Sequence, residues 1–260
     1  NSPESPIYHK GEVLYGLNWA KNAIRRGETA LIVEGYMDVV SLAAAEFENA
    51  VAPLGTAVTS EQVALLRRFT SRAHLLFDSD ASGLKATFRA ADLLLAEGVH
   101  PCVVTLPPGE DPDTIVHSEG AQALQGHIDG AVDVLDRKLQ LLEERDHFRS
   151  IEHTRAAIDR LLPTLRAVQD PALRDIYIAK VSQRTGVRRD TLEAELARVM
   201  PPPVPQRVTR RRDHGHPSRP SRASVPDMGP ERELLLLMTK DRGWIERVGE
   251  RLGPHDFVDV

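Results

Sequence analysis

Short apolar runs alternate with amphipathic segments along the chain up to Val116. Four apolar runs have the length of buried strands: residues 30–33, 51–57, 75–77 and 102–106. Three segments have apolar residues at every third or fourth position, which predicts helices: residues 12–26, 60–69 and 85–96. Strands that alternate with helices through short loops are typical of an α/β fold with a parallel sheet. We therefore predict such a sheet with flanking helices.

The pattern changes to long, charged amphipathic segments from about Ala121 to Met200. Helices are predicted at residues 128–147, 150–168, 171–185 and 189–199. This second part is expected to be an α-helical bundle subdomain.

A stretch rich in Pro, Arg and Ser follows at residues 201–230. Between Arg207 and Arg222 it holds six arginines against the single acid Asp213. Such a composition cannot bury a core, so we expect a flexible linker there. A helical pattern resumes at residues 231–252, and the last segment to Val260 is interpreted as the start of another module that has been cut off.

Acidic residues follow three of the predicted strands. Glu34 comes directly after the first strand, and Asp78 and Asp80 follow the third. Asp111 and Asp113 lie in the loop after the fourth. Because the carboxyl ends of parallel strands meet at one edge of a sheet, we expect these acids to lie together, where open α/β sheets bind their ligands.

Neighbouring carboxylates repel each other unless a cation or a shared proton intervenes. Clusters of carboxylate oxygens suit Mg²⁺ or Mn²⁺. The alternative interpretation is structural: Asp78-Ser79-Asp80 as an exposed turn that caps the next helix, and Asp38 as a favourable charge at a helix N-terminus.

Composition narrows the class of protein. The formal net charge of −5 and the 5% aromatic content argue against a uniformly basic nucleic-acid binder. Cys102 is the only cysteine, so no disulfide framework is expected, which is compatible with the cytoplasm. The sequence has no apolar run long enough to span a bilayer and no signal peptide, and no membrane association is expected.

The motifs that are missing also direct the interpretation. A Gly-x-x-x-x-Gly-Lys phosphate loop and a Gly-x-Ser-x-Gly nucleophile elbow are both absent. One Glu and several Asp without His or Cys ligands favour metal-dependent phosphoryl transfer over glycoside or peptide chemistry.

Four sequence blocks, in this order along the chain, resemble the TOPRIM domain, and their residues resemble most those of bacterial replicative primases of the DnaG type. They are Glu34-Gly35-Tyr36-Met37-Asp38-Val39, Leu54-Gly55-Thr56, Asp78-Ser79-Asp80-x-x-Gly83 and Gly109-Glu110-Asp111-Pro112-Asp113. The segments 1–10 and 14–17 are similar to the part that precedes TOPRIM in those primases.

The resemblance implies five segments. Residues 1–28 would be the tail of a basic N-terminal subdomain and residues 29–118 the TOPRIM domain. The helical subdomain would span 119–200 and the linker 201–230. The remaining residues, 231–260, would be the truncated start of a helicase-binding domain.

The resemblance also assigns roles to residues. Glu34, Asp78 and Asp80 would be the catalytic metal ligands, with Glu34 also a candidate general base for the primer 3′-hydroxyl. Three further acids, Asp38, Asp111 and Asp113, would support the same metal site. Lys10 and Lys85 would contact the DNA template or the incoming nucleotide. The cofactor would be Mg²⁺ or Mn²⁺, and the family's zinc site is expected to be absent from this chain.

The implied activity is the synthesis of short RNA primers on single-stranded DNA by a nucleotidyltransferase. Its partners would be the template, NTPs and the replicative helicase, in the bacterial cytoplasm. This piece alone could be inactive. The alternatives are a TOPRIM-type nuclease and a non-catalytic module that binds DNA and the helicase. A topoisomerase would need a nucleophilic tyrosine in a separate domain, and Tyr8, Tyr15, Tyr36 and Tyr177 lie in none.

Overall fold

The computed structural model describes residue 5 and residues 8–55 and 57–198 of the chain. The chain divides into two units after Pro203, and all the described residues lie in the first. The predicted linker and the segment 231–260 lie outside the described residues.

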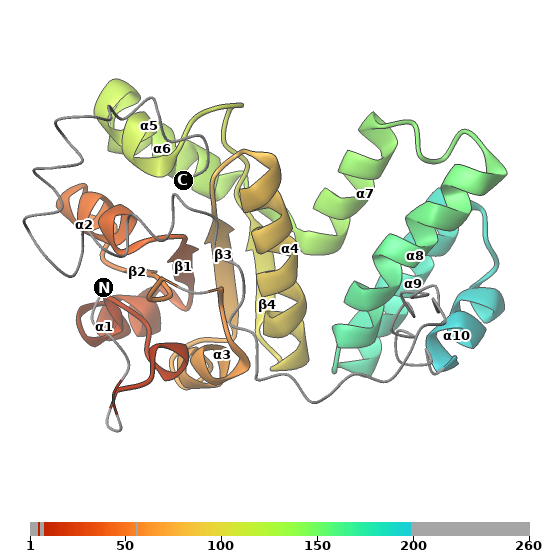
Figure 1. Ribbon diagram of the computed structural model, residues 1–260, viewed down its shortest axis with the longest axis horizontal. Coiled ribbons are helices and arrows are strands. Elements are labelled where there is room, and N and C mark those ends of the chain that lie inside the picture. The colour runs from red at the N-terminus through yellow and green to blue at the C-terminus, as the bar shows by residue number, and fades with distance from the viewer. Residues whose placement is uncertain (1–4, 6–7, 56, 199–260) are drawn as a thin grey trace, which may run out of the picture. The chain divides into compact units, whose positions relative to one another are not determined.

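A five-stranded sheet in the order β2-β1-β3-β4-β5 forms the centre of this unit (Figure 1). Its strands are β1 (Ala30–Val33), β2 (Ala50–Val51), β3 (Arg72–Leu76), β4 (His100–Val103) and β5 (Val132–Asp133). The strands β1 to β4 run parallel to one another, and β5 runs antiparallel to β4. The predicted parallel sheet with flanking helices is confirmed for β1 to β4, and the two-residue antiparallel edge strand β5, which precedes the helices of the second part, makes the whole sheet mixed.

Helices cover both faces of the sheet. Those of the first part are α1 (Leu17–Gly27), α2 (Tyr36–Ala44), α3 (Ser60–Leu66), α4 (Ala81–Ala96), α5 (Pro112–Glu119) and α6 (Ala121–Asp129). The second part holds α7 (Val134–Glu144), α8 (Ile151–Ala167), α9 (Pro171–Thr185) and α10 (Arg189–Ala197). A short 3₁₀ helix, η1 (Lys10–Glu12), precedes α1.

Strand β1 shows why its run is apolar throughout. Ala30 and Ile32 belong to the larger core cluster, on one face, and Leu31 and Val33 to a second cluster, on the other. Alternate side chains of a strand point to opposite faces, so a strand covered on both sides needs apolar residues at every position. All four residues are buried.

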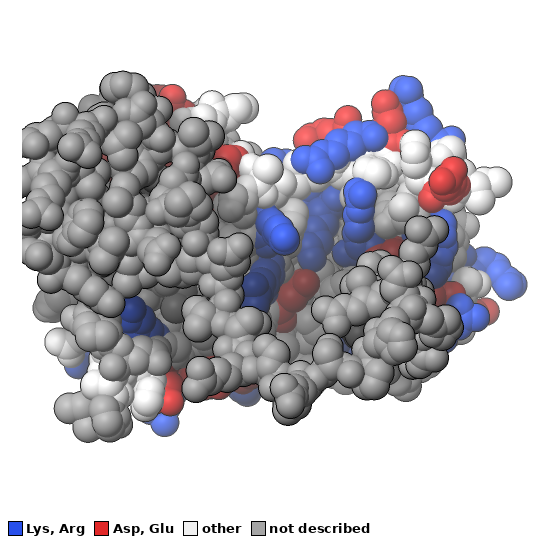
Figure 2. Space-filling view, viewed as in Figure 1, with Lys and Arg blue, Asp and Glu red and all other residues white. Residues whose placement is uncertain are grey.

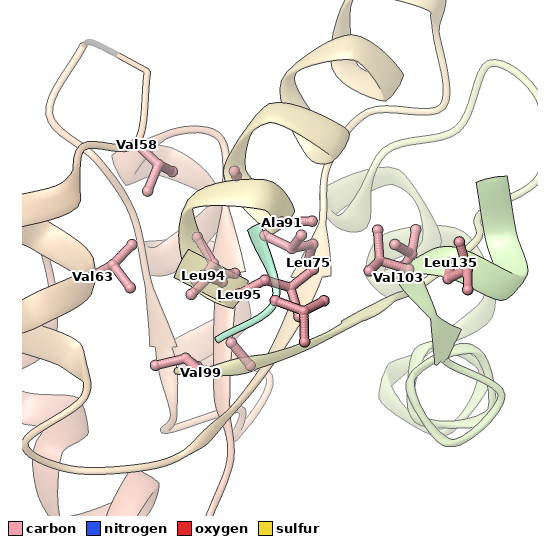
Figure 3. Close-up of a cluster of buried hydrophobic side chains, with 14 of the residues drawn as sticks. Val58, Val63, Leu75, Ala91, Leu94, Leu95, Val99, Val103 and Leu135 are labelled. Atoms are coloured by element: carbon pink, nitrogen blue, oxygen red, sulfur yellow. The ribbon is translucent and has the colours of Figure 1, made fainter. Parts of the chain in front are cut away.

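Helix α4 supplies much of the larger core. Its Ala91, Leu94 and Leu95 pack towards Leu75 of β3 and Val103 of β4 (Figure 3). The same cluster continues into α7, α8, α9 and α10, so the helical part shares the core of the sheet. Helices α2, α5 and α6 bury Leu42, Ile115 and Leu124 in the second cluster.

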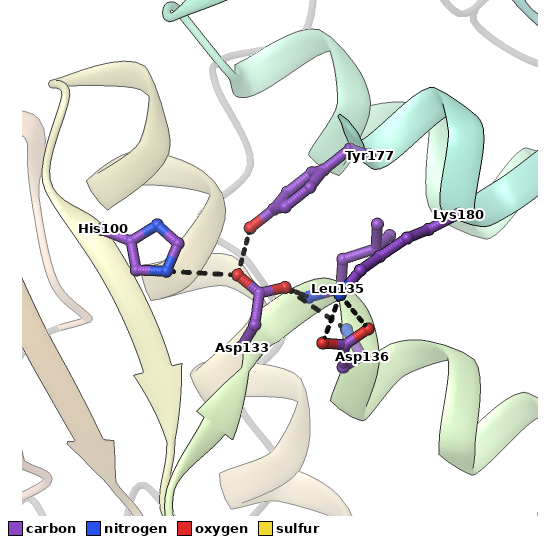
Figure 4. Close-up of polar contacts among 6 residues, drawn as sticks. All are labelled: His100, Asp133, Leu135, Asp136, Tyr177 and Lys180. Carbon is purple, nitrogen blue, oxygen red and sulfur yellow. Dashed lines mark hydrogen bonds and ion pairs between the residues drawn. The ribbon is translucent and has the colours of Figure 1, made fainter. Parts of the chain in front are cut away.

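A polar junction also links the sheet to the helical part. The Tyr177 hydroxyl of α9 donates to Oδ2 of Asp133 at 2.5 Å, and His100 of β4 lies 3.3 Å from the same oxygen (Figure 4). Asp133 also caps α7 by accepting from the Leu135 backbone N–H at 2.8 Å. One carboxylate therefore joins β4, β5, α7 and α9.

The described residues contain no helix that is both long and apolar enough to cross a membrane.

Candidate metal and phosphoryl-transfer site

The acids that follow three strands lie at one edge of the sheet, as the sequence predicts. Glu34 follows the last residue of β1, and Asp78 and Asp80 occupy the loop between β3 and α4. Asp111 immediately precedes α5, and Asp113 lies in its first turn. Because β1, β3 and β4 are parallel neighbours, all three loops leave from their carboxyl ends. We call these five carboxylates, together with Asp38 in the first turn of α2, the acid edge.

The members of the acid edge influence one another electrostatically. Burial is the largest cause that raises the pKa of Glu34, and repulsion from Asp78, Asp80 and Asp38 raises it further. The pKa of Asp38 is raised by burial and then by Asp78, Asp111 and Asp113. Carboxylates that are partly buried and lie beside one another are unfavourable as anions, and a bound cation would offset their repulsion.

The pKa of Asp78 is also raised, first by burial and then by the charges of Asp111 and Asp80. Asp78 therefore interacts with Asp80 in its own loop and with Asp111 in the loop after β4. This links the acids after β3 to those after β4.

The loop after β3 is held against Glu34. Oε1 of Glu34 accepts a hydrogen bond from the backbone N–H of Asp78 at 3.1 Å. A Cβ atom at Gly83 would lie 2.8 Å from this Oε1 and 2.4 Å from the Asp78 carbonyl oxygen. Glycine is therefore required for the close approach of α4 to both acids.

Several acids also serve as helix caps. Oδ1 of Asp80 accepts from the Gly83 N–H at 2.6 Å at the start of α4, and Oδ1 of Asp111 accepts from the Thr114 N–H at 2.7 Å. Strand β3 ends at Leu76, so Asp78 and Asp80, which were predicted to follow the strand, both lie in the loop before α4. The capping interpretation thus holds for Asp80, whose carboxylate has further lone pairs.

Hydroxyl groups that the sequence analysis did not select support the acids. The Ser41 hydroxyl donates to Oδ1 of Asp113. Ser79 donates to the Glu110 carbonyl oxygen at 3.2 Å and accepts from the Gly109 N–H at 2.9 Å, which ties two acid-bearing loops together. The available signal was spacing: Ser41 lies three residues after Asp38 on one helix face.

The donor chemistry fits a hard divalent cation. All six side chains are carboxylates, which Mg²⁺ and Mn²⁺ prefer. Oε2 of Glu110, in the same loop as Asp111, is shielded from solvent and has no hydrogen-bond partner. In the side-chain conformations of the described residues, however, no group of three or more His, Cys, Asp or Glu lies close enough together to hold a metal ion. Some carboxylates would therefore have to turn to bind one.

Two pockets flank the acid edge. One of about 250 Å³ opens beside Glu34 and is also lined by Phe77 and Arg89. The other, of about 550 Å³, lies between α2 and α5 and includes Asp38, Asp111 and Asp113 in its wall. The edge thus offers space for a ligand on either side.

The two predicted lysines lie on different elements. Lys10 begins η1, and its carbonyl oxygen accepts from Gln62 Nε2 of α3 at 2.9 Å. Lys85 is exposed in the second turn of α4 and lines a third pocket with Phe88. Their roles towards template or nucleotide stay predictions.

Two sequence-family models match separate parts of the chain. The Toprim-like family matches residues 31–116, which include all six acids of the acid edge. The family described as the DnaB-helicase binding domain of primase matches residues 138–190, from α7 to the start of α10. The segment 231–260, where the sequence analysis places the start of such a domain, is not tested by this match.

Curated relatives carry the name DNA primase. The protein from Clostridium acetobutylicum is 37% identical over 193 residues, which cover 74% of this chain and 32% of the relative. The one from Halalkalibacterium halodurans is 32% identical over 266 residues, covering 100% of this chain and 44% of the relative. The chain thus spans less than half the length of these relatives.

Solved structures show the same likeness. A DNA primase domain from Pseudomonas aeruginosa has a TM-score of 0.68 at 34% identity, covering 75% of this chain and 62% of that one. A DnaG primase catalytic domain bound to ssDNA has a TM-score of 0.65 at 33% identity, covering 74% and 62%.

Proposed function

We propose that this chain, which resembles the catalytic core of the bacterial DnaG-type primases in sequence and in fold, synthesises short RNA primers on single-stranded DNA. The reaction would be metal-dependent nucleotidyl transfer, in which a primer 3′-hydroxyl attacks the α-phosphate of an NTP and pyrophosphate leaves. One observation carries the proposal: six carboxylates lie at the edge where α/β sheets bind ligands, and burial together with the charges of neighbouring acids raises the pKa of Glu34, Asp38 and Asp78.

The acids have distinct roles in this proposal. Glu34, Asp78 and Asp80 would hold the divalent cation, and Asp38, Asp111 and Asp113 would support it. When bound, Mg²⁺ or Mn²⁺ would neutralise phosphate charge and favour ionisation of the attacking hydroxyl. Ser79, which joins the loops that carry Asp78 and Glu110, would keep the two sets of acids in register.

A second role proposed for Glu34 is proton transfer. In the metal-free chain burial and the neighbouring acids raise the pKa of Glu34, and its Oε1 is held beside the loop that carries Asp78. We propose it as the general base that accepts the proton of the primer 3′-hydroxyl. The pocket beside Glu34, with Arg89 in its wall, would take the triphosphate.

The helicase partner is supported by a separate match. Residues 138–190 match the helicase-binding family, so we propose that α7 to α9 contribute to contact with a replicative helicase. Such a primase would act at the bacterial replication fork in the cytoplasm.

Metal binding can be tested on the chain itself. Mn²⁺ titration with paramagnetic NMR broadening is compared among the wild type and the Glu34→Gln, Asp78→Asn and Asp80→Asn variants. We expect broadening around the acid edge in the wild type and its loss in these three variants. The control Asp190→Asn, at an exposed position of α10, should keep it. Broadening that all variants retain would contradict the assignment.

Activity is tested in a full-length primase that contains this chain. Asp78→Ala and Asp80→Ala are expected to abolish primer synthesis while the circular dichroism spectrum is unchanged. Cleavage of DNA without nucleotide incorporation by the wild type would instead support the nuclease alternative.

A further inference from the structure

A pocket of about 450 Å³ lies between the sheet-covering helix α4 and the helices α7 and α8. Figure 2 shows Lys and Arg side chains gathering in the hollow over these helices. The lining residues are Ala81, Leu84, Lys85, Phe88, Lys138, Leu141, Leu142, Arg145, Arg160 and Leu161. We call this the cationic pocket.

The charges of the pocket are of one sign. Four of its lining residues are cations and none is an acid. Lys138 is balanced by Asp92, whose Oδ1 lies 3.2 Å from Nζ. The other three, Lys85, Arg145 and Arg160, are exposed at the pocket and leave a net positive charge there.

The neighbouring His147 side chain adds no negative charge that would offset these cations. A nitrogen of Arg160 lies 2.8 Å from Nε2 of His147, and a guanidinium can only donate, so the imidazole accepts and is neutral. The pKa of His147 is lowered by desolvation and then by Arg160, His153 and Arg145, which are all basic side chains. This part of the surface therefore attracts anions.

The floor of the pocket is apolar and includes an aromatic ring. Leu142 and Leu161 are buried, and Phe88 and Leu141 are half-buried. Cations at the rim with an aromatic side chain in the floor are the two features that single-stranded nucleic acids use, since phosphates need the first and bases stack on the second.

The pocket begins where the acid edge ends. Ala81, in its wall, is the first residue of α4 and follows Asp80 directly. Ala81 and Phe88 are seven residues apart on one helix, about 10 Å along its axis. That length exceeds one phosphate and corresponds to about three nucleotides at the spacing of a stacked strand.

We propose that the cationic pocket binds single-stranded DNA, with the phosphates on Lys85, Arg145 and Arg160 and a base against Phe88. A strand held there would run along α4 towards the acid edge. This inference rests on the proposed function for its choice of DNA, because a primase must hold a template while it extends a primer. Arg145, Arg160 and Phe88 are new positioning residues in this proposal.

Binding of a fluorescent oligo-dT to the full chain, followed by anisotropy at several salt concentrations, tests the proposal. Arg145→Glu and Arg160→Glu are expected to weaken binding each by several-fold and together by at least tenfold. Because each phosphate contact on a single strand contributes about −0.7 to the slope of log K against log salt, the double variant should flatten this slope by about 1.4. The matched control is Arg68→Glu, an exposed arginine outside the pocket.

Position is tested by photocrosslinking of the same oligonucleotide with 5-iodouracil bases. A crosslink to the α4 peptide that carries Phe88 is expected, and Phe88→Leu should remove it while the thermal melt stays cooperative. Equal loss of affinity in the Arg68→Glu control would overturn the proposal, as would crosslinks that map only elsewhere.

Two further outcomes separate this inference from its alternatives. If dTMP displaces the oligonucleotide at equal phosphate concentration, the pocket is a mononucleotide site and the strand proposal is wrong. If Arg145→Glu and Arg160→Glu leave DNA affinity unchanged while Mn²⁺ still broadens the acid edge, the pocket proposal fails and the proposed function stands. If instead Mn²⁺ does not broaden the acid edge while the pocket variants still weaken DNA binding, the metal-site assignment fails and the pocket proposal stands.

Discussion

Gly83 is the residue at which the acid edge has least room. Its missing Cβ lets the Asp78 carbonyl and Oε1 of Glu34 approach the first turn of α4. We predict that Gly83→Ala displaces both groups and destabilises the chain by about 1–3 kcal/mol, although alanine is the better helix former. Urea unfolding would measure the loss, and Mn²⁺ titration should show weaker binding.

The control for this substitution is Gly126→Ala on α6. A Cβ there has no atom within 4 Å. Alanine should therefore be neutral or stabilise by about 0.5–1 kcal/mol through helix propensity alone. Destabilisation of both variants to the same degree would mean that the close approach at Gly83 has no special cost.

The raised pKa values of Glu34, Asp38 and Asp78 set the direction of a pH effect. An acid whose pKa is higher in the folded than in the unfolded chain binds its proton more tightly when folded. Its contribution to stability is complete below the unfolded pKa of about 4, and is lost as the pH rises through the folded value. At neutral pH these charges therefore oppose folding.

We predict that Asp78→Asn stabilises the metal-free chain at neutral pH and that the gain shrinks as the pH falls towards about 4. Urea midpoints in EDTA across this range would measure the gain. Addition of Mg²⁺ should stabilise the wild type more than the variant, because binding to the folded state raises its stability. A gain of equal size at both ends of the pH range would contradict the electrostatic cause.

Among the elements, α4, α7 and α8 meet at a buried ionic cluster. Nζ of Lys138 lies 3.2 Å from Oδ1 of Asp92, contacts the Thr164 hydroxyl and lies 4.9 Å from the centre of the Phe88 ring. Burial lowers the pKa of Lys138, and the charge of Asp92 acts in the opposite direction. Within the described part of the chain, Asp92 is the carboxylate on which this buried ammonium depends.

Removal of one partner should cost more than removal of both. We predict that Asp92→Ala destabilises by about 3 kcal/mol, because it leaves a buried charge unpaired. The double variant Asp92→Leu with Lys138→Met should recover a large part of this loss in urea unfolding. As the surface control, Glu48→Ala breaks the exposed pair with Arg26 and should cost less than about 1 kcal/mol.

The elements with a clear apolar period were predictable from the sequence. Strand β1 and helix α9 have the predicted bounds, and the Toprim-type fold and its resemblance to primase cores are confirmed. The predicted helix 128–147 is wrong in its first turns. Gly130 ends α6, and Val132 and Asp133 pair with β4 before Asp133 caps α7. Local pattern could not reveal an edge strand of two residues whose pairing is made by tertiary contact.

The candidate site was predictable in its acids but not in its details. Strand-end positions identified five of the six carboxylates, since a parallel sheet brings such ends together, and the resemblance to TOPRIM domains added Asp38. The contacts of Ser41, Ser79 and Gly83 depend on how loops from different strands approach one another, which a single sequence does not specify. The cationic pocket was missed for the same reason, because its arginines come from α7 and α8, and only Lys85 lies near the acids in sequence.

Over the whole described unit, the sheet and the helical part share one core and the Asp133 junction. We predict that they unfold together and that Tyr177→Phe keeps a single transition while it lowers stability by about 1.5–3 kcal/mol, the value of a hydrogen bond to a charged group. Coincident urea curves by circular dichroism and by hydrogen exchange would show this. Separate transitions for β4 and α9 in the wild type would contradict a shared core.

Helix α4 has a consequence for partners that bind at a distance. Its first turn is fixed to Glu34 and Asp78 through Gly83, and twelve residues after Asp80 its Asp92 binds Lys138, inside the segment that matches the helicase-binding family. A ligand of α7 or α8 that prefers one position of α4 over another must change the affinity of the acid edge for its cation by the same factor as the cation changes the affinity for that ligand. Helix α4 therefore couples binding at its two ends, and the coupling factor can be measured either as a change in cation affinity or as a change in affinity for the ligand of α7 or α8.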